Sequence, residues 1–218
     1  MSELEYFYSA HSAYAYLGSA KFMEIAAAAG HSIVHKPIDL NRAMESYGST
    51  AFRERSVKQR DHFFRREMER WAEFRNVVMP GRPSNHHHSP DLSNRMLIAA
   101  IGEGRNVDRL AHRMLEAHWG ESADLADPET LIQIARDINE DGRGWLNLAD
   151  NEEVAARYAA NTDEAISRGV PGSPTYFVNG DMFYGQDRLD LVERAIKKSF
   201  RDSWPPIIQQ KVVFYIFL

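Results

Sequence analysis

Apolar and aromatic positions at the start of the chain follow the pattern of a strand, a helix and a second strand. Glu3–Ser9 is short and rich in aromatic residues, which is typical of a buried strand. Ser12 stands where a helix N-cap belongs, Ala-rich sequence follows, and Gly30 fits the position after the helix. Ser32–His35 alternates briefly, and Pro37 then ends the strand. A crossover helix of this length predicts that the two strands run parallel.

The middle of the chain, from about Tyr47 to Arg168, has helical periodicity and no convincing strand. The first helix is predicted over Phe52–Phe74, which is charged and aromatic. Its apolar residues are spaced to form one helix face. That face consists of Phe63, Phe64, Met68, Trp71 and Phe74.

A loop rich in proline, glycine and histidine separates this helix from four more. Asp127 is a suitable N-cap for the third of them. Together these elements predict a helical insertion of roughly 120 residues. The four helices are predicted at Leu92–Gly104, Asp108–Trp119, Pro128–Asn139 and Glu152–Arg168.

Strand signals return after the insertion. Thr175–Val178 is β-branched and aromatic, Asn179-Gly180 is a strong hairpin signal, and Asp181–Tyr184 supplies the partner strand. Gln186–Ser199 is an amphipathic helix, with Leu189, Val192 and Ile196 predicted to face inward.

The order β-α-β, helical insert, β-β-α predicts an α/β protein with a thioredoxin fold and a large all-helical insertion. Residues 1–40 and 169–200 are assigned to the thioredoxin-like domain, and residues 41–168 to the helical insertion domain. Residues 201–218 form a C-terminal tail of unknown role.

Composition and charge narrow the class of protein. The chain is 44% hydrophobic and 26% charged, as in ordinary globular proteins. A formal net charge of −5 argues against nucleic acid and anionic membranes as partners. No apolar run reaches the roughly 18 residues that span a bilayer, and the first residues are acidic where a signal peptide is basic. A cytoplasmic, soluble protein is therefore expected.

The sequence contains no cysteine. This excludes disulfides, thiolate metal sites, iron–sulfur clusters and a thiol nucleophile supplied by the protein. A disulfide oxidoreductase is therefore excluded on chemical grounds.

Two positions in this topology are candidates for chemistry. Ser12 lies at the turn into the first helix, where backbone N–H groups and the helix dipole stabilise an anion or thiolate; a plain N-cap serine is the alternative. Pro174 occupies the place of a cis-proline that faces this turn. A cis bond would expose backbone groups of the preceding residue to an extended, peptide-like ligand, whereas the alternative is a simple loop.

Two charged residues are further candidates. The Gln186-Asp187 pair opens the last helix, where the carboxylate either caps the helix or holds a ligand ammonium group. Lys36 ends the second strand, where it either meets a substrate carboxylate or is simply solvated.

The consecutive residues His86, His87 and His88 suggest a metal site, but three neighbouring side chains cannot converge on one ion without a strained loop. No metal is therefore predicted. Asn85 is a polar candidate for lining a cleft. His11 either tunes a thiolate near Ser12 or is a surface residue.

With these motifs identified, the chain resembles a known family. YFYSAHSAYAYLG looks like the opening of 2-hydroxychromene-2-carboxylate isomerases and the related kappa-class glutathione transferases. GVPGSPTYFVNGDMFYGQDRLDLVERAI is similar to the family's C-terminal cis-proline segment, and FFRREMERWAEF followed by Pro83-Ser84-Asn85 fits the insertion. The resemblance covers nearly all of residues 3–199. These proteins are DsbA-like thioredoxin folds in which the redox Cys-x-x-Cys is replaced, here by the residues at positions 12–15.

The resemblance implies a homodimeric, glutathione-dependent cis–trans isomerase of aromatic-compound catabolism. Its partners would be glutathione and a small aromatic substrate, and the glutathione thiolate would add reversibly to an unsaturated aromatic carboxylate. Ser12 would activate the sulfur, and Ser173, before Pro174, would pair its backbone with the cysteinyl part. Lys36 and Asn85 match positions near the substrate. The γ-glutamyl end would be held by Tyr184, Gly185, Gln186 and Asp187.

The chain departs from the family pattern at Ala10, Ala13 and Ala15, and in the three histidines after Asn85. The substrate pocket is therefore expected to differ. A kappa-type glutathione transferase or peroxidase remains an alternative, as does a thioredoxin-like protein that binds without catalysis.

Overall fold

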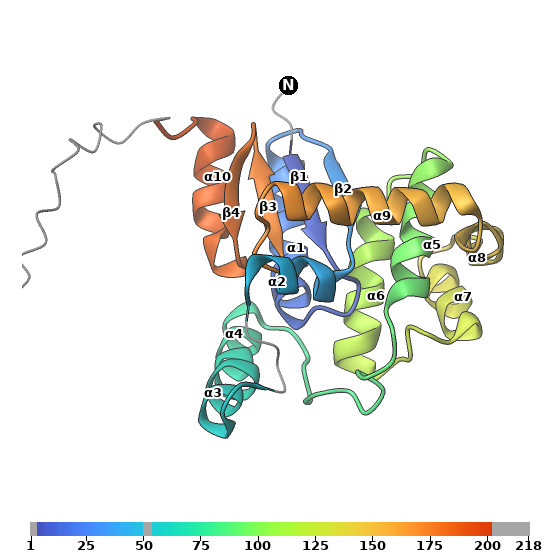
Figure 1. Cartoon of the computed structure of the whole chain (residues 1–218), viewed down its shortest axis with the longest axis horizontal. Helices are drawn as coiled ribbons and strands as arrows, with labels where there is room; N and C mark the ends of the chain where they lie inside the picture. Colours follow the sequence, from blue (N-terminus) through green and yellow to red (C-terminus); the bar gives the residue numbers. More distant parts are fainter. Residues whose placement is uncertain (1–3, 50–53, 202–218) are drawn as a thin grey trace, which may run out of the picture.

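The computed structural model describes residues 4–49 and 54–201. Its strands form one mixed sheet in the order β2-β1-β3-β4, with β1 parallel to β2 and antiparallel to β3, and β3 antiparallel to β4 (Figure 1). The predicted thioredoxin topology is confirmed. The strands are β1 (Leu4–Tyr8), β2 (Ile33–Pro37), β3 (Thr175–Val178) and β4 (Asp181–Tyr184).

The first crossover follows the local sequence signals closely. Helix α1 (Ala13–Ala28) begins after Ser12, whose hydroxyl accepts a hydrogen bond from the Ala15 N–H at 3.3 Å. Gly30 follows the helix with a φ of +70°, which glycine adopts at little cost. Strand β2 continues through Pro37, two residues beyond the predicted alternation. An edge strand tolerates proline because one side of it has no ladder partner.

All elements described between β2 and β3 are helical, as predicted. Helices α2 and α8 are additional to the prediction, because eight residues are too few for a clear periodicity; Asp39 and Asp141 cap them. The predicted helix over 52–74 corresponds to α3, a π-helical turn η2 and α4, and its first residues lie outside the described part of the chain. The bounds are α2 (Leu40–Tyr47), α3 (Val57–Asp61), η2 (His62–Arg66), α4 (Glu67–Arg75), α5 (Asp91–Gly102), α6 (Asp108–Glu121), α7 (Pro128–Asp137), α8 (Gly142–Ala149) and α9 (Glu152–Ser167).

The helix face predicted for residues 52–74 is only partly buried. Met68 is buried, and Phe64 and Trp71 pack against the core, but Phe63 is 45% and Phe74 is 74% exposed. At roughly 3.6 residues per turn, Phe63 and Phe74 are only about 20° apart around the helix axis, so the two exposed rings lie at the same edge of the apolar stripe. The helix therefore packs through the side of its stripe that carries Phe64, Met68 and Trp71.

One core joins the sheet to the insertion. Tyr6 and Tyr8 of β1 stack with ring centroids 4.1 Å apart, in the same buried cluster as Leu97 of α5, Leu110 of α6 and Leu131 of α7. The opposite face of the sheet has a smaller cluster beneath α2 and α9, and Figure 1 shows α9 running across the strands. The insertion therefore packs on the sheet without building a separate core.

The last elements in the described part of the chain are a short 3-10 helix η3 (Gln186–Arg188) and helix α10 (Leu189–Lys197). Leu189 and Val192 are buried and Ile196 packs against the core, as predicted. Within residues 4–49 and 54–201, no helix combines the length and apolar character needed to cross a membrane. The predicted tail lies outside the described residues from position 202 onward.

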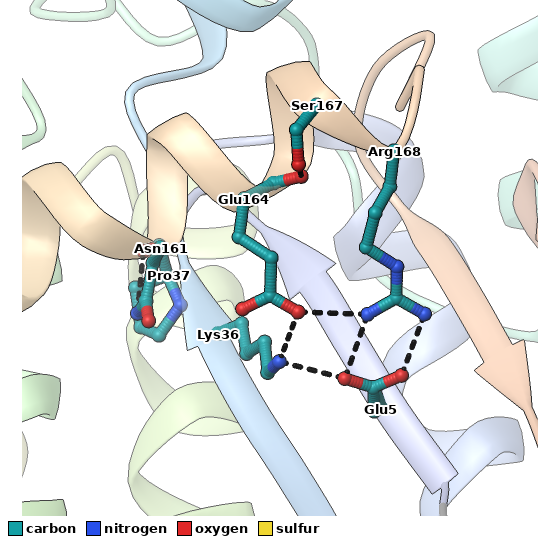
Figure 2. Close-up of polar contacts among 7 residues, drawn as sticks. All are labelled: Glu5, Lys36, Pro37, Asn161, Glu164, Ser167 and Arg168. Atoms are coloured by element: carbon teal, nitrogen blue, oxygen red, sulfur yellow. Dashed lines mark hydrogen bonds and ion pairs between the residues drawn. The ribbon is translucent and has the colours of Figure 1, made fainter. Parts of the chain in front are cut away.

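A charged cluster ties α9 to the sheet (Figure 2). The buried Glu5 carboxylate accepts two hydrogen bonds from Arg168, at 2.9 and 2.8 Å, and pairs with Lys36 Nζ at 2.6 Å. Glu164 Oε1 contacts both cations, at 2.6 Å from Lys36 and 2.8 Å from Arg168. Burial raises the pKa of Glu5, but its hydrogen bonds to Arg168 and Lys36 outweigh burial, so the pKa is lowered overall.

Replacing Glu5 with glutamine should reduce the free energy of unfolding by about 3 kcal/mol, because two partly buried cations lose their shared counterion. Glu164→Gln is the matched control; its side chain is 36% exposed, so the loss should be about 1 kcal/mol or less. Urea denaturation of the two variants and the natural protein measures both. Equal losses would contradict this account of the cluster.

Candidate functional site

The β1–α1 turn and the loop before β3 meet at one edge of the sheet. Ser12 Oγ donates a hydrogen bond to the Ser173 carbonyl at 3.1 Å, and the Ser9 N–H donates to Ser173 Oγ at 3.2 Å. The Ser173–Pro174 peptide bond is cis, as predicted from the topology. Ser12 also caps α1, so its predicted N-cap position is confirmed and its hydroxyl makes both contacts at once.

The segment after β4 packs against this loop. The Gly185 N–H donates to the Pro174 carbonyl at 3.0 Å, and Gly185 has a φ of +100°. The buried Gln186 packs closely against Gly18 of α1. A side chain at position 18 would place its Cβ only 2.6 Å from the Cβ of Gln186. The backbone of this segment is therefore fixed on both sides.

Asp187 does not act as the predicted helix cap. Neither η3 nor α10 has a side-chain hydrogen bond at its N-cap. Its carboxylate lies against the backbone at Gly185 and is 3.1 Å from the Arg188 guanidinium. With its side chain 41% exposed, this carboxylate remains accessible to a ligand.

A cleft of about 500 Å³ lies where these segments meet. The structure brings six of the predicted residues together in its walls, and the buried Pro174 lies directly behind Ser173 in the chain. The six are Ser12, Ser173, Tyr184, Gly185, Gln186 and Asp187.

The rest of the cleft wall was missed from the sequence. Phe63, Phe64 and Trp71 contribute to it, whereas the sequence predicted only that they share one helix face. Tyr14 lines it too; its hydroxyl donates to the Phe63 carbonyl, and burial, with Glu67, raises its pKa to about 12. The width of the aromatic stripe in this segment was the sequence feature that could have indicated a cleft wall. A helix with a wide apolar stripe can pack one half of it on the core and line a cleft with the other half.

Lys36 and Asn85 are not brought into this cleft. Lys36 pairs with Phe7 in the sheet register and lies on the α9 side, engaged by the charged cluster of Figure 2. Its position at a strand end does not determine which face of the strand it takes. Asn85 Nδ2 donates to the Ser122 carbonyl at 3.0 Å, while its buried Oδ1 has no hydrogen-bond partner within the described chain.

A second, wider cleft of about 810 Å³ adjoins the first. Helix α2 and the loop over 82–91 supply much of its wall. The two clefts have several wall residues in common, so a ligand in one can contact a ligand in the other. The shared residues are His11, Leu40, Met44, Arg55, Phe64, His86 and Trp119.

Histidine rings form part of this shared wall. His86 Nδ1 lies 2.9 Å from His118 Nε2, and His118 Nδ1 lies 2.9 Å from the Ala123 carbonyl. The His11 ring is 4.9 Å from the His86 ring, centroid to centroid. His87 and His88 turn to other partners, Ser84 and Asp124 respectively, which agrees with the expectation that consecutive histidines do not converge. Among the residues described, no three His, Cys, Asp or Glu side chains are grouped to hold a metal ion.

Residues 3–197 match the DSBA-like thioredoxin domain family, nearly the whole described chain. The chain belongs to this family. The resemblance to 2-hydroxychromene-2-carboxylate isomerases is also confirmed. The enzyme of that name from Pseudomonas putida is 25% identical over 203 residues, which cover 92% of this chain and 97% of the relative. The Sphingobium xenophagum enzyme is 26% identical over 195 residues, covering 87% and 95%.

Solved structures agree on the DSBA-like fold. A 2-hydroxychromene-2-carboxylate isomerase structure has a TM-score of 0.72 at 24% identity, covering 89% of this chain and 94% of its own. The cytosolic disulfide reductase DsbM from Pseudomonas aeruginosa, solved with GSH, has a TM-score of 0.60 at 15% identity, covering 90% and 93%. The named relatives support an isomerase within the DSBA-like family.

Three histidines at this DSBA-like cleft, His11, His86 and His118, have pKa values below the ordinary histidine value. Burial, reinforced by His118, lowers the pKa of His11 to about 4. Burial, with His11 and His118 nearby, lowers the pKa of His86 to about 3. Burial also lowers the pKa of His118. The rings therefore offer hydrogen-bonding nitrogens without a positive charge.

In a pH titration followed by the ring ¹⁵N shifts, His11 and His86 should remain neutral down to about pH 5. In the urea-unfolded chain histidines protonate near pH 6.5. The unfolded state then binds more protons between these values, so the free energy of unfolding should fall as the pH drops. His11→Gln and His86→Asn assign the signals. A folded-state midpoint between pH 6 and 7 for either ring would contradict the burial argument.

Proposed function

We propose that this protein is a glutathione-dependent isomerase that acts on an unsaturated aromatic carboxylate. The observation that carries the proposal is the cleft that gathers Ser12, Ser173 and the Tyr184–Asp187 segment in a chain without cysteine. Such a cleft has the means to hold a thiol, while the protein has none of its own. Relatives named as isomerases support the same reaction class.

Glutathione is expected to lie along the edge of the sheet. Its sulfur would sit at the N-terminus of α1, where backbone N–H groups and the helix dipole favour a thiolate. The backbone of Ser173, before the cis-Pro174, would pair with the cysteinyl amide. The γ-glutamyl ammonium would reach Asp187, whose carboxylate is accessible and makes no capping bond.

Ser12 would change partners when glutathione binds. Its one hydroxyl proton is now donated to the Ser173 carbonyl. A cysteinyl N–H that donates to this carbonyl would compete for the same acceptor and leave the hydroxyl proton for the sulfur. Binding and activation of the thiolate would then be coupled through a single acceptor.

The proposed reaction balances without a redox step. The thiolate adds to the carbon β to a conjugated carbonyl, a C–S bond forms, and the π electrons move to the carbonyl oxygen. The former double bond rotates as a single bond. The electrons then return, the C–S bond breaks, and glutathione leaves as the thiolate it was at the start.

From the same resemblance we propose that the protein is a cytoplasmic homodimer that acts in the catabolism of aromatic compounds. A kappa-type glutathione transferase or peroxidase would use the same thiol site and is distinguished by accumulation of a conjugate or by peroxide consumption. A non-catalytic binding protein would not bind glutathione at all. Glutathione binding therefore tests the site before any substrate is known.

Asp187→Asn should weaken glutathione binding roughly tenfold to a hundredfold, the effect of losing a charged hydrogen bond. Asp190→Asn is the matched control, since Asp190 is an exposed carboxylate three residues further along, in the first turn of α10. Isothermal titration with reduced glutathione measures both variants. Absence of binding by the natural protein at millimolar glutathione would refute the proposed function.

Ser12→Ala should raise the thiol pKa of bound glutathione by about one pH unit, because the thiolate loses a hydrogen-bond donor. Thiolate absorbance near 240 nm, recorded against pH in the saturated complex, measures the change. Ser12→Thr keeps the hydroxyl and should restore a low thiol pKa, whereas Ser32→Ala alters an exposed serine and should leave it unchanged. An unaltered thiol pKa in Ser12→Ala would rule out activation by this hydroxyl.

A further inference from the structure

We infer that Asn94 of helix α5 is a positioning residue for the proposed thiol site. From inside the helical insertion, its side chain fixes the peptide groups of the turn over residues 9–12, so that this turn favours a thiolate at the N-terminus of α1. The inference rests on the proposed function and adds a part of the site that lies behind the cleft walls. Strand pairing ties the two ends of the turn to Ser173, whereas Asn94 acts on the residues between them.

The turn has few partners for its buried backbone. One hydrogen bond of its own closes it, from the Ser12 N–H to the Ser9 carbonyl at 3.0 Å. Ser9 and Ala10 are fully buried, so their N–H groups need acceptors inside the protein. The Ser9 N–H donates to Ser173 Oγ. The Ala10 N–H donates to Asn94 Oδ1 at 2.9 Å, its only acceptor within residues 4–49 and 54–201. Loss of the Asn94 side chain would therefore leave a buried peptide N–H unpaired.

The hydrogen-bond network determines which way the Asn94 amide points. The Ile38 carbonyl can only accept, so the atom 3.3 Å from it must be the amide nitrogen. The Ala10 N–H can only donate, so the atom that it meets must be the amide oxygen. The nitrogen also lies 3.2 Å from Ser9 Oγ and 3.1 Å from the Tyr158 hydroxyl oxygen. Both ends of the amide agree, and the side chain is held in one orientation.

Asn94 does little for the helix that carries it. Asparagine is a poor helix former, and a buried amide is costly unless its polar atoms are paired. The side chain is nevertheless fully buried in α5, close to the core residues Met96 and Leu97. All its hydrogen-bond partners lie outside α5. The amide therefore serves the turn and the segments around it.

Trp119 of α6 holds the other side of the turn. Its indole N–H donates to the His11 carbonyl at 2.9 Å, so this oxygen points toward the insertion. A carbonyl oxygen directed at the sulfur would repel a thiolate, because it is the negative end of the peptide dipole. With the Ala10 N–H and the His11 carbonyl both bound by the insertion, the peptide groups of the turn are not free to rotate. The turn is thereby fixed in the conformation that leads into α1.

Asn94→Leu removes the amide at nearly constant side-chain size. It should raise the thiol pKa of bound glutathione by about half a pH unit, a roughly threefold change in acid dissociation, as expected when peptide dipoles beside a charge are disturbed. Thiolate absorbance against pH in the saturated complex measures the change. Asn161→Leu is the matched control. Asn161 is also buried on an insertion helix, α9, but its Nδ2 donates to the Pro37 carbonyl at 3.2 Å and not to the turn. The control should leave the thiol pKa unchanged, although both variants lose stability.

A second variant decides the matter if Asn94→Leu fails to fold. Trp119→Phe keeps an aromatic ring and removes the indole donor, so it should also raise the thiol pKa, and an unchanged value would then overturn the inference. An unchanged thiol pKa in folded Asn94→Leu, or an equal rise in Asn161→Leu, would overturn it as well. Glutathione binding by the natural protein is recorded first, because its absence would instead mark failure of the proposed function.

Hydrogen exchange on the free protein tests the turn without any ligand. The Ala10 N–H should be protected from exchange, as the Tyr6 N–H of the central strand β1 is. In Asn94→Leu, Ala10 should exchange roughly tenfold faster relative to Tyr6, because its acceptor is lost. Asn161→Leu should keep the ratio of the two rates. Rapid exchange of the Ala10 N–H in the natural protein would contradict the role of Asn94 even if glutathione binds.

Discussion

The fold closes through two hydrogen bonds between the β1–α1 turn and Ser173, which join residues 161 and 164 positions apart. The sheet register makes them possible: Phe7 lies opposite Thr175, so the chain leaving β1 and the chain entering β3 share one edge. Thr175 in turn lies opposite Tyr184, which brings the end of β4 to the same edge. The geometry of the cleft around Ser12 and Ser173 is therefore determined by strand pairing, and the loops only connect the strand ends.

The insertion supplies a different part of the site. It shares the sheet's main core, so its helices are held rigidly against α1 and β1. Its side chains line both clefts: Phe63 and Trp71 line the smaller one, and Phe64 and His86 lie in the wall that the two clefts share. Changes in the insertion can thus alter the walls of both clefts while strand pairing keeps the contacts of Ser12 and Ser9 with Ser173 in place.

The features that the sequence predicted correctly are those that a few neighbouring residues determine. The Ser12 cap, the Asn179-Gly180 hairpin and the cis-proline all depend on a few adjacent residues and a recognisable topology. Lys36 was placed near the substrate because it ends a strand, but strand parity turned it to the opposite face. The contact of His86 with His118 crosses 32 residues and depends on how the loop lies on α6, which no local pattern encodes. The separate partners of His87 and His88 agree with the prediction that consecutive side chains do not converge on one point.

The neutral histidine wall also bears on which reaction the proposed thiol site favours. Addition of a thiolate to a conjugated carbonyl gives an enolate, and protonation of that enolate on carbon traps a stable conjugate. With the pKa of His11 and of His86 lowered to about 4 and about 3, neither ring carries an acidic proton at neutral pH. Tyr14, with a pKa raised to about 12 and its hydroxyl held by the Phe63 carbonyl, is an equally poor proton source. A cleft that withholds protons lets the enolate expel the sulfur, which favours isomerisation over conjugate formation.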